Sequence, residues 1–141
     1  MLDSKLVLPY KDDAGAIRGE TVGAMREGDY YRIKNIPLYA SKIALYDLIK
    51  IRNREGIFYF HRIIESSGRN VIQMIVFNDR EFTPLSKNLD RFGCEWRRGD
   101  IPQLIAFDVP KHVAYLPVKE WLDQGELEQR WGYREACLCH S

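Results

Sequence analysis

The sequence predicts an α+β fold, with a small β-barrel-like subdomain in residues 1–68 and a ferredoxin-like βαββαβ subdomain in residues 69–141. Two observations carry this prediction. The first half contains short strand signals separated by turns and no convincing helix, which is typical of a small, half-open β-barrel. The second half alternates strand and helix signals in the order of a split βαβ motif, with two helices on one face of a four-stranded antiparallel sheet.

Length and composition are consistent with this division. The chain has 141 residues, of which 45% are hydrophobic and 29% charged, so it can build one domain or two small ones that share an interface. The formal net charge of +1 provides little general attraction for nucleic acids or membranes. No stretch approaches the roughly 18 apolar residues of a membrane span, and the N-terminus lacks the features of a signal peptide. We therefore expect a soluble, cytoplasmic protein.

Five short strands are expected in the first half, where a polar loop at residues 11–19 and two turns separate them. The turns are Glu27-Gly28-Asp29 and residues 52–56. Pro9 places the first strand at a sheet edge or a strand end, because proline lacks the N–H that a ladder needs. In chain order, the expected strands are residues 5–9, 21–25, 30–34, 45–51 and 57–64.

The second half has clearer signals, beginning with a strand that is apolar on both faces, as a central strand should be. Thr83 followed by Pro84 predicts the start of a helix that ends at Gly93. Pro117 and Gly125 delimit a second, shorter helix. The expected strands are residues 71–77, an edge strand at 94–98, 104–109 and 131–137.

Short motifs are distributed along the chain from about residue 20 onward. They are residues 31–40, which end in Asn-Ile-Pro-Leu-Tyr-Ala, then Tyr46-Asp47, residues 65–68, Gly93-Cys94, and residues 131–138, which contain Trp-Gly-Tyr-Arg-Glu-Ala-Cys. Together they resemble a widespread family of small bacterial proteins that is known only as a domain of unknown function. The resemblance implies a bacterial origin and a compact size, and it implies no activity.

The sequence contains no recognised catalytic or metal-binding motif. None of the histidines, His61, His112 and His140, is paired locally with a serine or cysteine nucleophile. Cys137 and Cys139 precede His140 and are ligand types that zinc prefers, but their spacing is too short and a second pair is missing. The odd cysteine count does not suggest a disulfide framework. We predict no catalytic residue, no metal and no cofactor, and a frayed tail after the last strand.

An acidic run extends from residue 120 to residue 129, with four acids and no base. A small, motif-poor bacterial protein is more often a binding module than a catalyst. Our leading hypothesis is an immunity protein that binds and neutralises an antibacterial toxin, with the acidic run facing a basic toxin domain. The partner-binding candidates are Glu120, Asp123, Glu126 and Glu128, with Trp121 as an aromatic anchor.

Two other function classes remain open. Aromatic and basic residues interleave in several segments, which favours binding of RNA or single-stranded nucleic acid by base stacking and phosphate contacts. The third class is an enzyme with an unfamiliar site between the subdomains, where a titratable group would have a perturbed pKa. The nucleic-acid candidates are Tyr31, Phe60, Trp96 and Arg97, and the catalytic crease would lie near His61, Ser67 or Asn70.

Overall fold

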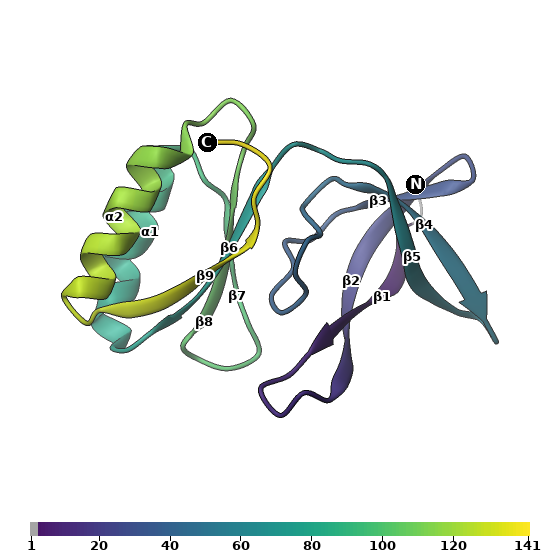
Figure 1. The fold of residues 1–141 in the computed structure, drawn as a ribbon, viewed down its shortest axis with the longest axis horizontal. Coiled ribbons are helices and arrows are strands. Elements are labelled where there is room, and N and C mark those ends of the chain that lie inside the picture. Colours follow the sequence, from purple (N-terminus) through teal and green to yellow (C-terminus); the bar gives the residue numbers. More distant parts are fainter. Residues whose placement is uncertain (1–2) are drawn as a thin grey trace.

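The structure is a computed structural model that describes residues 3–141 (Figure 1). It is a mixed α+β fold, built mostly of strands in two sheets, which confirms the predicted fold class. Strand pairs are antiparallel apart from one short parallel contact. No helix in the described residues is long and apolar enough to cross a membrane.

The first sheet is a closed barrel in the order β1-β2-β3-β4-β5. Alternation along the strands directs Leu6, Leu8 and Val22 into its core, because successive side chains point to opposite faces. The barrel closes where Val7 of β1 meets β5 in parallel. The strands are β1 (Asp3–Lys11), β2 (Ile17–Glu27), β3 (Tyr30–Ile33), β4 (Leu48–Arg54) and β5 (Ile57–Glu65).

The second sheet has four strands in the order β7-β8-β6-β9, and both helices cover one of its faces (Figure 1). The side chains beneath the helices form a buried core that includes Phe107, Leu122 and Trp131. The short strand β7 lies at a sheet edge, as predicted for residues 94–98. The elements are β6 (Asn70–Val76), α1 (Phe82–Phe92), β7 (Trp96–Arg98), β8 (Leu104–Val109), α2 (Tyr115–Leu127) and β9 (Trp131–Cys137).

Both helices begin or end differently from the sequence prediction. Thr83 is not a cap, because a 3₁₀ turn (η1, Asp79–Glu81) runs directly into α1 and Asn78 caps that turn by accepting a hydrogen bond from the Arg80 N–H. Gly93 does end α1, with a left-handed φ of 81°. Gly125 does not end α2 but lies buried inside the helix. The Trp131 ring occupies the space where a side chain at this position would stand.

The segment between β3 and β4 joins the two sheets. Its residues Ile36, Leu38 and Leu45 pack on the helix-free face of the second sheet, in a buried cluster with Val71 and Ala106. This buried cluster combines side chains from both halves of the chain. The sequence did not indicate it, because these contacts bring together residues far apart in the chain.

Asn70 and His140 fix the C-terminal tail against the linker between the sheets. The Asn70 carboxamide accepts hydrogen bonds from the Cys139 and His140 N–H groups at 2.6 and 3.1 Å, and its own N–H donates to the His140 carbonyl. The His140 ring nitrogens lie 2.9 Å from the carbonyl oxygens of Gly68 and Val113. The prediction of a frayed tail is therefore wrong.

Candidate functional site

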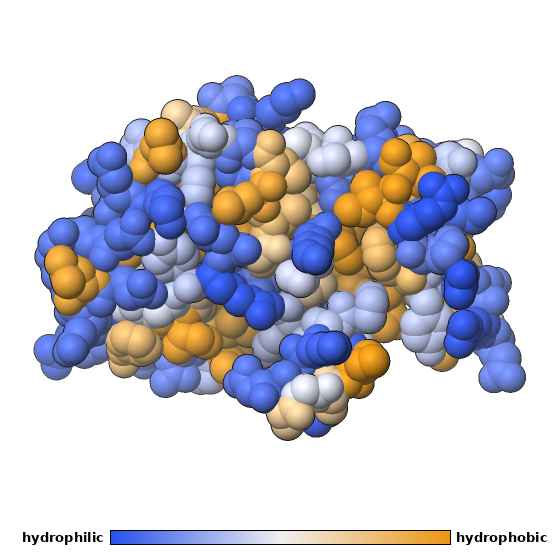
Figure 2. Space-filling view, viewed as in Figure 1, coloured by the Kyte–Doolittle hydropathy of each residue, from blue (hydrophilic) through white to orange (hydrophobic). Residues whose placement is uncertain are grey.

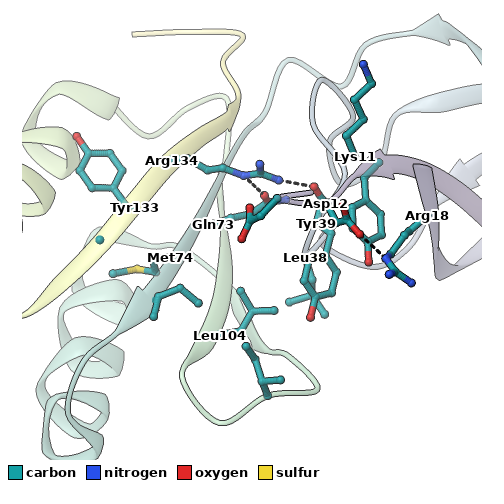
Figure 3. A pocket seen from close by; sticks show the side chains of 15 residues that line it. Lys11, Asp12, Arg18, Leu38, Tyr39, Gln73, Met74, Leu104, Tyr133 and Arg134 are labelled. Carbon is teal, nitrogen blue, oxygen red and sulfur yellow. Dashed lines mark hydrogen bonds and ion pairs between the residues drawn. The ribbon is translucent and has the colours of Figure 1, made fainter. Parts of the chain in front are cut away.

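A cleft of about 490 Å³ lies between the β1–β2 hairpin and the helix-free face of the second sheet (Figure 3). Its apolar lining includes Leu38, Ile75 and Leu104. Tyr10 and Tyr39 also line the cleft, with their rings stacked at a centroid distance of 4.9 Å. Such a concave surface, largely apolar with a few fixed polar groups, is the usual form of a binding site.

A network of polar side chains holds the cleft together. Arg134 donates from Nε to the Gln73 side-chain Oε1 at 2.6 Å and from Nη2 to the Tyr39 backbone carbonyl (Figure 3). The Gln73 amide donates in turn to the carbonyls of Pro37 and Ala40, at 3.1 and 2.8 Å. Buried Gln73 is thereby satisfied, and the Arg134 guanidinium is held at the cleft with Nη1 unpartnered among the described residues.

Glu20 holds the segment that forms one wall of the cleft. Its buried carboxylate accepts hydrogen bonds from the N–H groups of Leu38, Tyr39 and Ala40, at 2.6, 3.0 and 2.9 Å. The Tyr39 hydroxyl donates to Asp100 at 2.5 Å, and burial together with Asp100 raises the Tyr39 pKa to about 12. Tyr39 therefore stays a neutral donor at physiological pH.

Three exposed apolar side chains, here called the apolar strip, lie at or beside the cleft. They are Ile75, Phe77 and Ile101, which are 38%, 57% and 46% exposed. Ile75 and Ile101 line the cleft, and Phe77 packs over Gly132, which lines it as well. Clustered exposed apolar groups of this kind mark interaction surfaces.

The four acidic candidates on and after α2 are exposed, but most contact groups of the same chain. Glu120 alone has no polar partner among the described residues. The partners of the others are the Tyr133 hydroxyl for Asp123, the Tyr133 N–H for Glu126 (3.4 Å), and Arg130 for Glu128 (3.6 Å). The run therefore offers less free negative charge than its sequence suggests.

Trp121, the expected anchor of the acidic run, is mostly a core residue. Its ring lies 5.6 Å from that of Phe92 and 5.0 Å from that of Trp131, at tilted angles. It is partly buried against the core beneath the helices. The helical spacing that placed Trp121 beside the acids also turned it toward the sheet.

The structure does not bring the four nucleic-acid candidates onto one surface. Tyr31 is only 8% exposed and packs with Phe60 into the barrel core. Trp96 packs against the core of the second sheet, and Arg97 donates to the Ile36 carbonyl at 2.7 Å. Aromatic–basic alternation in these segments reflects strands with one buried face.

The residues expected in a catalytic crease have structural roles or lie elsewhere. Asn70 is fully buried against the tail, and the Ser67 N–H donates to Asp47 at 2.8 Å. His61 lies half-buried on β5, a strand of the barrel. The perturbed carboxyl near the linker is instead Asp108, which is fully buried, pairs with Arg69 at 2.5 Å, and has one oxygen without a hydrogen bond.

Asp108 makes stability depend on pH. Burial raises its pKa from 3.8 to about 6, against the opposing effect of Arg69, so the native state binds a proton more tightly than the unfolded chain. The resulting stability is complete below pH 3.8 and is lost as the pH rises through 6, by about 3 kcal/mol. Asp108→Asn cannot ionise. We therefore expect its free energy of unfolding, relative to that of the wild type, to rise by this amount between pH 4 and pH 7, as measured by urea unfolding at several pH values in that range. A difference that does not vary with pH would contradict this assignment.

Cys94 and Cys137 have the properties of structural thiols, since both are buried. Burial raises the pKa of both Cys94 and Cys137 to about 12, and the neighbouring Cys139 contributes to the shift at Cys137. The Sγ atoms of Cys137 and Cys139 lie 3.8 Å apart. No group of three or more metal-ligating side chains occurs in the part of the chain that the structure describes.

Sequence reasoning missed the cleft residues Gln73, Arg134 and Tyr39. Two of them lie in the motifs that carry the family resemblance, Tyr39 in residues 31–40 and Arg134 in residues 131–138. Gln73 is the one amide in an otherwise apolar strand, and a buried polar residue of this kind needs hydrogen-bond partners. That combination was the available signal.

Comparison with known proteins agrees with the resemblance. The family model of a domain of unknown function, DUF4265, matches residues 20–133. A crystal structure of a hypothetical protein from Neisseria gonorrhoeae is 26% identical, covers 100% of this chain and 99% of its own, and superposes with a TM-score of 0.88. No curated protein matches the chain.

Proposed function

Because the chain belongs to the DUF4265 family, a family of unknown function, we propose from its own geometry that it is a non-enzymatic protein-binding module that uses the cleft. The observation that carries this proposal is the cleft with the apolar strip beside it. A partner would insert an apolar or aromatic side chain over Leu38 and Leu104 and cover Ile75 and Ile101.

The composition of the cleft supports a protein partner. Tyrosine and arginine are enriched among the residues that dominate protein interfaces, and the cleft contains Tyr10, Tyr39, Tyr133, Arg18 and Arg134. Several of these side chains are held in place before binding, so little conformational entropy is lost when a partner docks.

The most specific form of the proposal is the immunity protein, which would neutralise a toxin in the cytoplasm. The small, motif-poor chain supports this form, because a protein that only binds and blocks a toxin needs no catalytic groups. The proposed contact surface moves from the acidic run to the cleft, because most of those acids have partners within the chain.

We also propose the finer architectural assignment. The order β7-β8-β6-β9 with two helices on one face supports a ferredoxin-like unit, and the preceding strands support a barrel-like unit. The change from one sheet to the other falls between β5 and β6, close to the predicted boundary at residues 68 and 69.

The test is the substitution Ile75→Asp, which places a charge in the cleft. We expect it to weaken retention of a stoichiometric protein partner by about 30-fold or more, as at a central interface position. The measurement is a nuclease-treated pull-down from the native bacterium, followed by titration of the recovered partner. Leu116→Asp, on an exposed site of α2, is the matched control and should retain the partner.

Two results would reject the cleft as the binding site. One is equal binding by Ile75→Asp and wild-type protein, with both folded by circular dichroism. The other is loss of the partner on charge reversal at Glu120 with no effect at Ile75, which would return the interface to the acidic run.

A further inference from the structure

The β4–β5 hairpin presents an unusual set of exposed cations. Lys50, Arg52 and Arg54 alternate along β4, and Arg62 lies on β5. All four are exposed, while Ile49 and Ile51, the chain neighbours of Lys50, pack into the barrel core. The cations therefore share the outer face of the hairpin, which lies at the end of the barrel farthest from the helices (Figure 1). The same end of the molecule is largely hydrophilic in Figure 2.

The strand register brings these charges together. Lys50 lies directly opposite Arg62, and a β-bulge beside this pair leaves His61 as an extra residue. His61 lies on the same hairpin, where desolvation and then the charges of Arg52, Lys50 and Arg62 lower its pKa. Like charges opposite one another across a strand pair destabilise a sheet.

No ion pair within the described part of the chain offsets this repulsion. Among residues 3–141, no carboxylate forms an ion pair with Lys50, Arg52, Arg54 or Arg62. By contrast, Arg32 on the neighbouring strand β3 pairs with Glu27 at 2.6 Å. An uncompensated cluster that costs stability is expected where an external anion supplies the missing charge.

An exposed aromatic ring belongs to the same face. Tyr59 is 37% exposed and pairs with Arg52 across the ladder. Phosphate-binding cations beside an exposed ring on a strand surface are the features that bind unpaired nucleotides, since the cations contact the backbone and the ring stacks on a base. A membrane surface or a sulfated polymer would use the cations but not the ring.

We propose that the outer face of the β4–β5 hairpin binds single-stranded nucleic acid, with Lys50, Arg52 and Arg62 contacting phosphates and Tyr59 stacking on a base. This site lies on β4 and β5, which contribute no residue to the cleft, so it does not depend on the protein-binding proposal. It also differs from the earlier nucleic-acid candidates: of these only Phe60 lies on the hairpin, and its partly buried ring packs against the barrel core.

The test is fluorescence anisotropy of a labelled oligothymidylate of about 20 nucleotides, titrated with the full chain at several salt concentrations. Each phosphate contact to a single strand contributes about 0.7 to the log–log salt slope. The triple variant Lys50→Gln, Arg52→Gln, Arg62→Gln should therefore reduce the slope by about 2 and the affinity by at least about tenfold at roughly 0.1 M salt. It should unfold at no lower temperature than the wild type, because it removes repulsion.

Matched controls separate this site from general charge. The triple variant Arg80→Gln, Lys87→Gln, Arg91→Gln removes the same charge from the surface of η1 and α1 and should bind as the wild type does. Tyr59→Leu should lower affinity while leaving the salt slope unchanged, because stacking carries no charge.

Three outcomes would overturn the proposal. The first is no binding of the oligonucleotide at about 50 mM salt. The second is equal loss in the two triple variants, which would indicate only a general charge effect. The third is equally tight binding to duplex DNA or to vesicles containing phosphatidylglycerol, with no effect of Tyr59→Leu, which would assign the face to another polyanion.

Discussion

Replacing Glu20 by alanine is expected to destabilise the protein by about 4 kcal/mol and to abolish binding at the cleft. The carboxylate is the partner of three consecutive N–H groups, at Leu38, Tyr39 and Ala40. Leu38 and Ala40 are buried, so water cannot replace the lost acceptor without opening the core around these two residues. Each buried donor left without a partner costs about 1–3 kcal/mol.

Urea unfolding measures the loss, and two further variants define its cause. Glu20→Gln keeps the volume but has one acceptor oxygen in place of two, so it should lose about half as much. Glu120→Ala removes an exposed acid and should change the free energy of unfolding by less than about 0.5 kcal/mol. Wild-type stability in Glu20→Ala would mean that the segment has another anchor.

Gly125→Ala is expected to destabilise the protein by about 3 kcal/mol or more, although alanine is the better helix former. A Cβ at this position would lie 2.6 Å from Cη2 of Trp131 and closer still to two other ring atoms. The ring is fully buried and its Nε1 donates to the Leu122 carbonyl at 3.0 Å, so it cannot move without breaking that hydrogen bond and disturbing the core.

The expected effect has the opposite sign to the usual effect of this substitution in a helix. At a free helical site, glycine to alanine stabilises by up to about 1 kcal/mol. Gly132→Ala is the control, because a Cβ there would meet only Phe77, at an ordinary contact distance of 3.7 Å. Thermal unfolding should separate the two variants by about 10 °C. A stable Gly125→Ala protein would show that the Trp131 ring can relocate.

The cleft could be only partly predicted, because its residues are distant in sequence. Gln73 and Arg134 are 61 positions apart, and Tyr39 is 95 positions from Arg134. Their motifs were visible, yet no local pattern indicates that a strand in the second half holds a loop from the first. The outer face of the β4–β5 hairpin could also be predicted only in part. The alternating cations of β4 are visible in the sequence, but the bulge that sets Lys50 opposite Arg62 is not.

The sequence by itself determined the fold class, most strands, and turns such as the one at Gly28, because alternation of apolar residues and turn chemistry act over a few residues. Only the tertiary structure decided the roles of Gly125 and Trp121, because both pack against the Trp131 ring. It also decided which charges stay free, since Asp123 and Glu128 find partners that only folding brings near. Packing and charge pairing depend on where elements meet in space, and local preferences do not specify that.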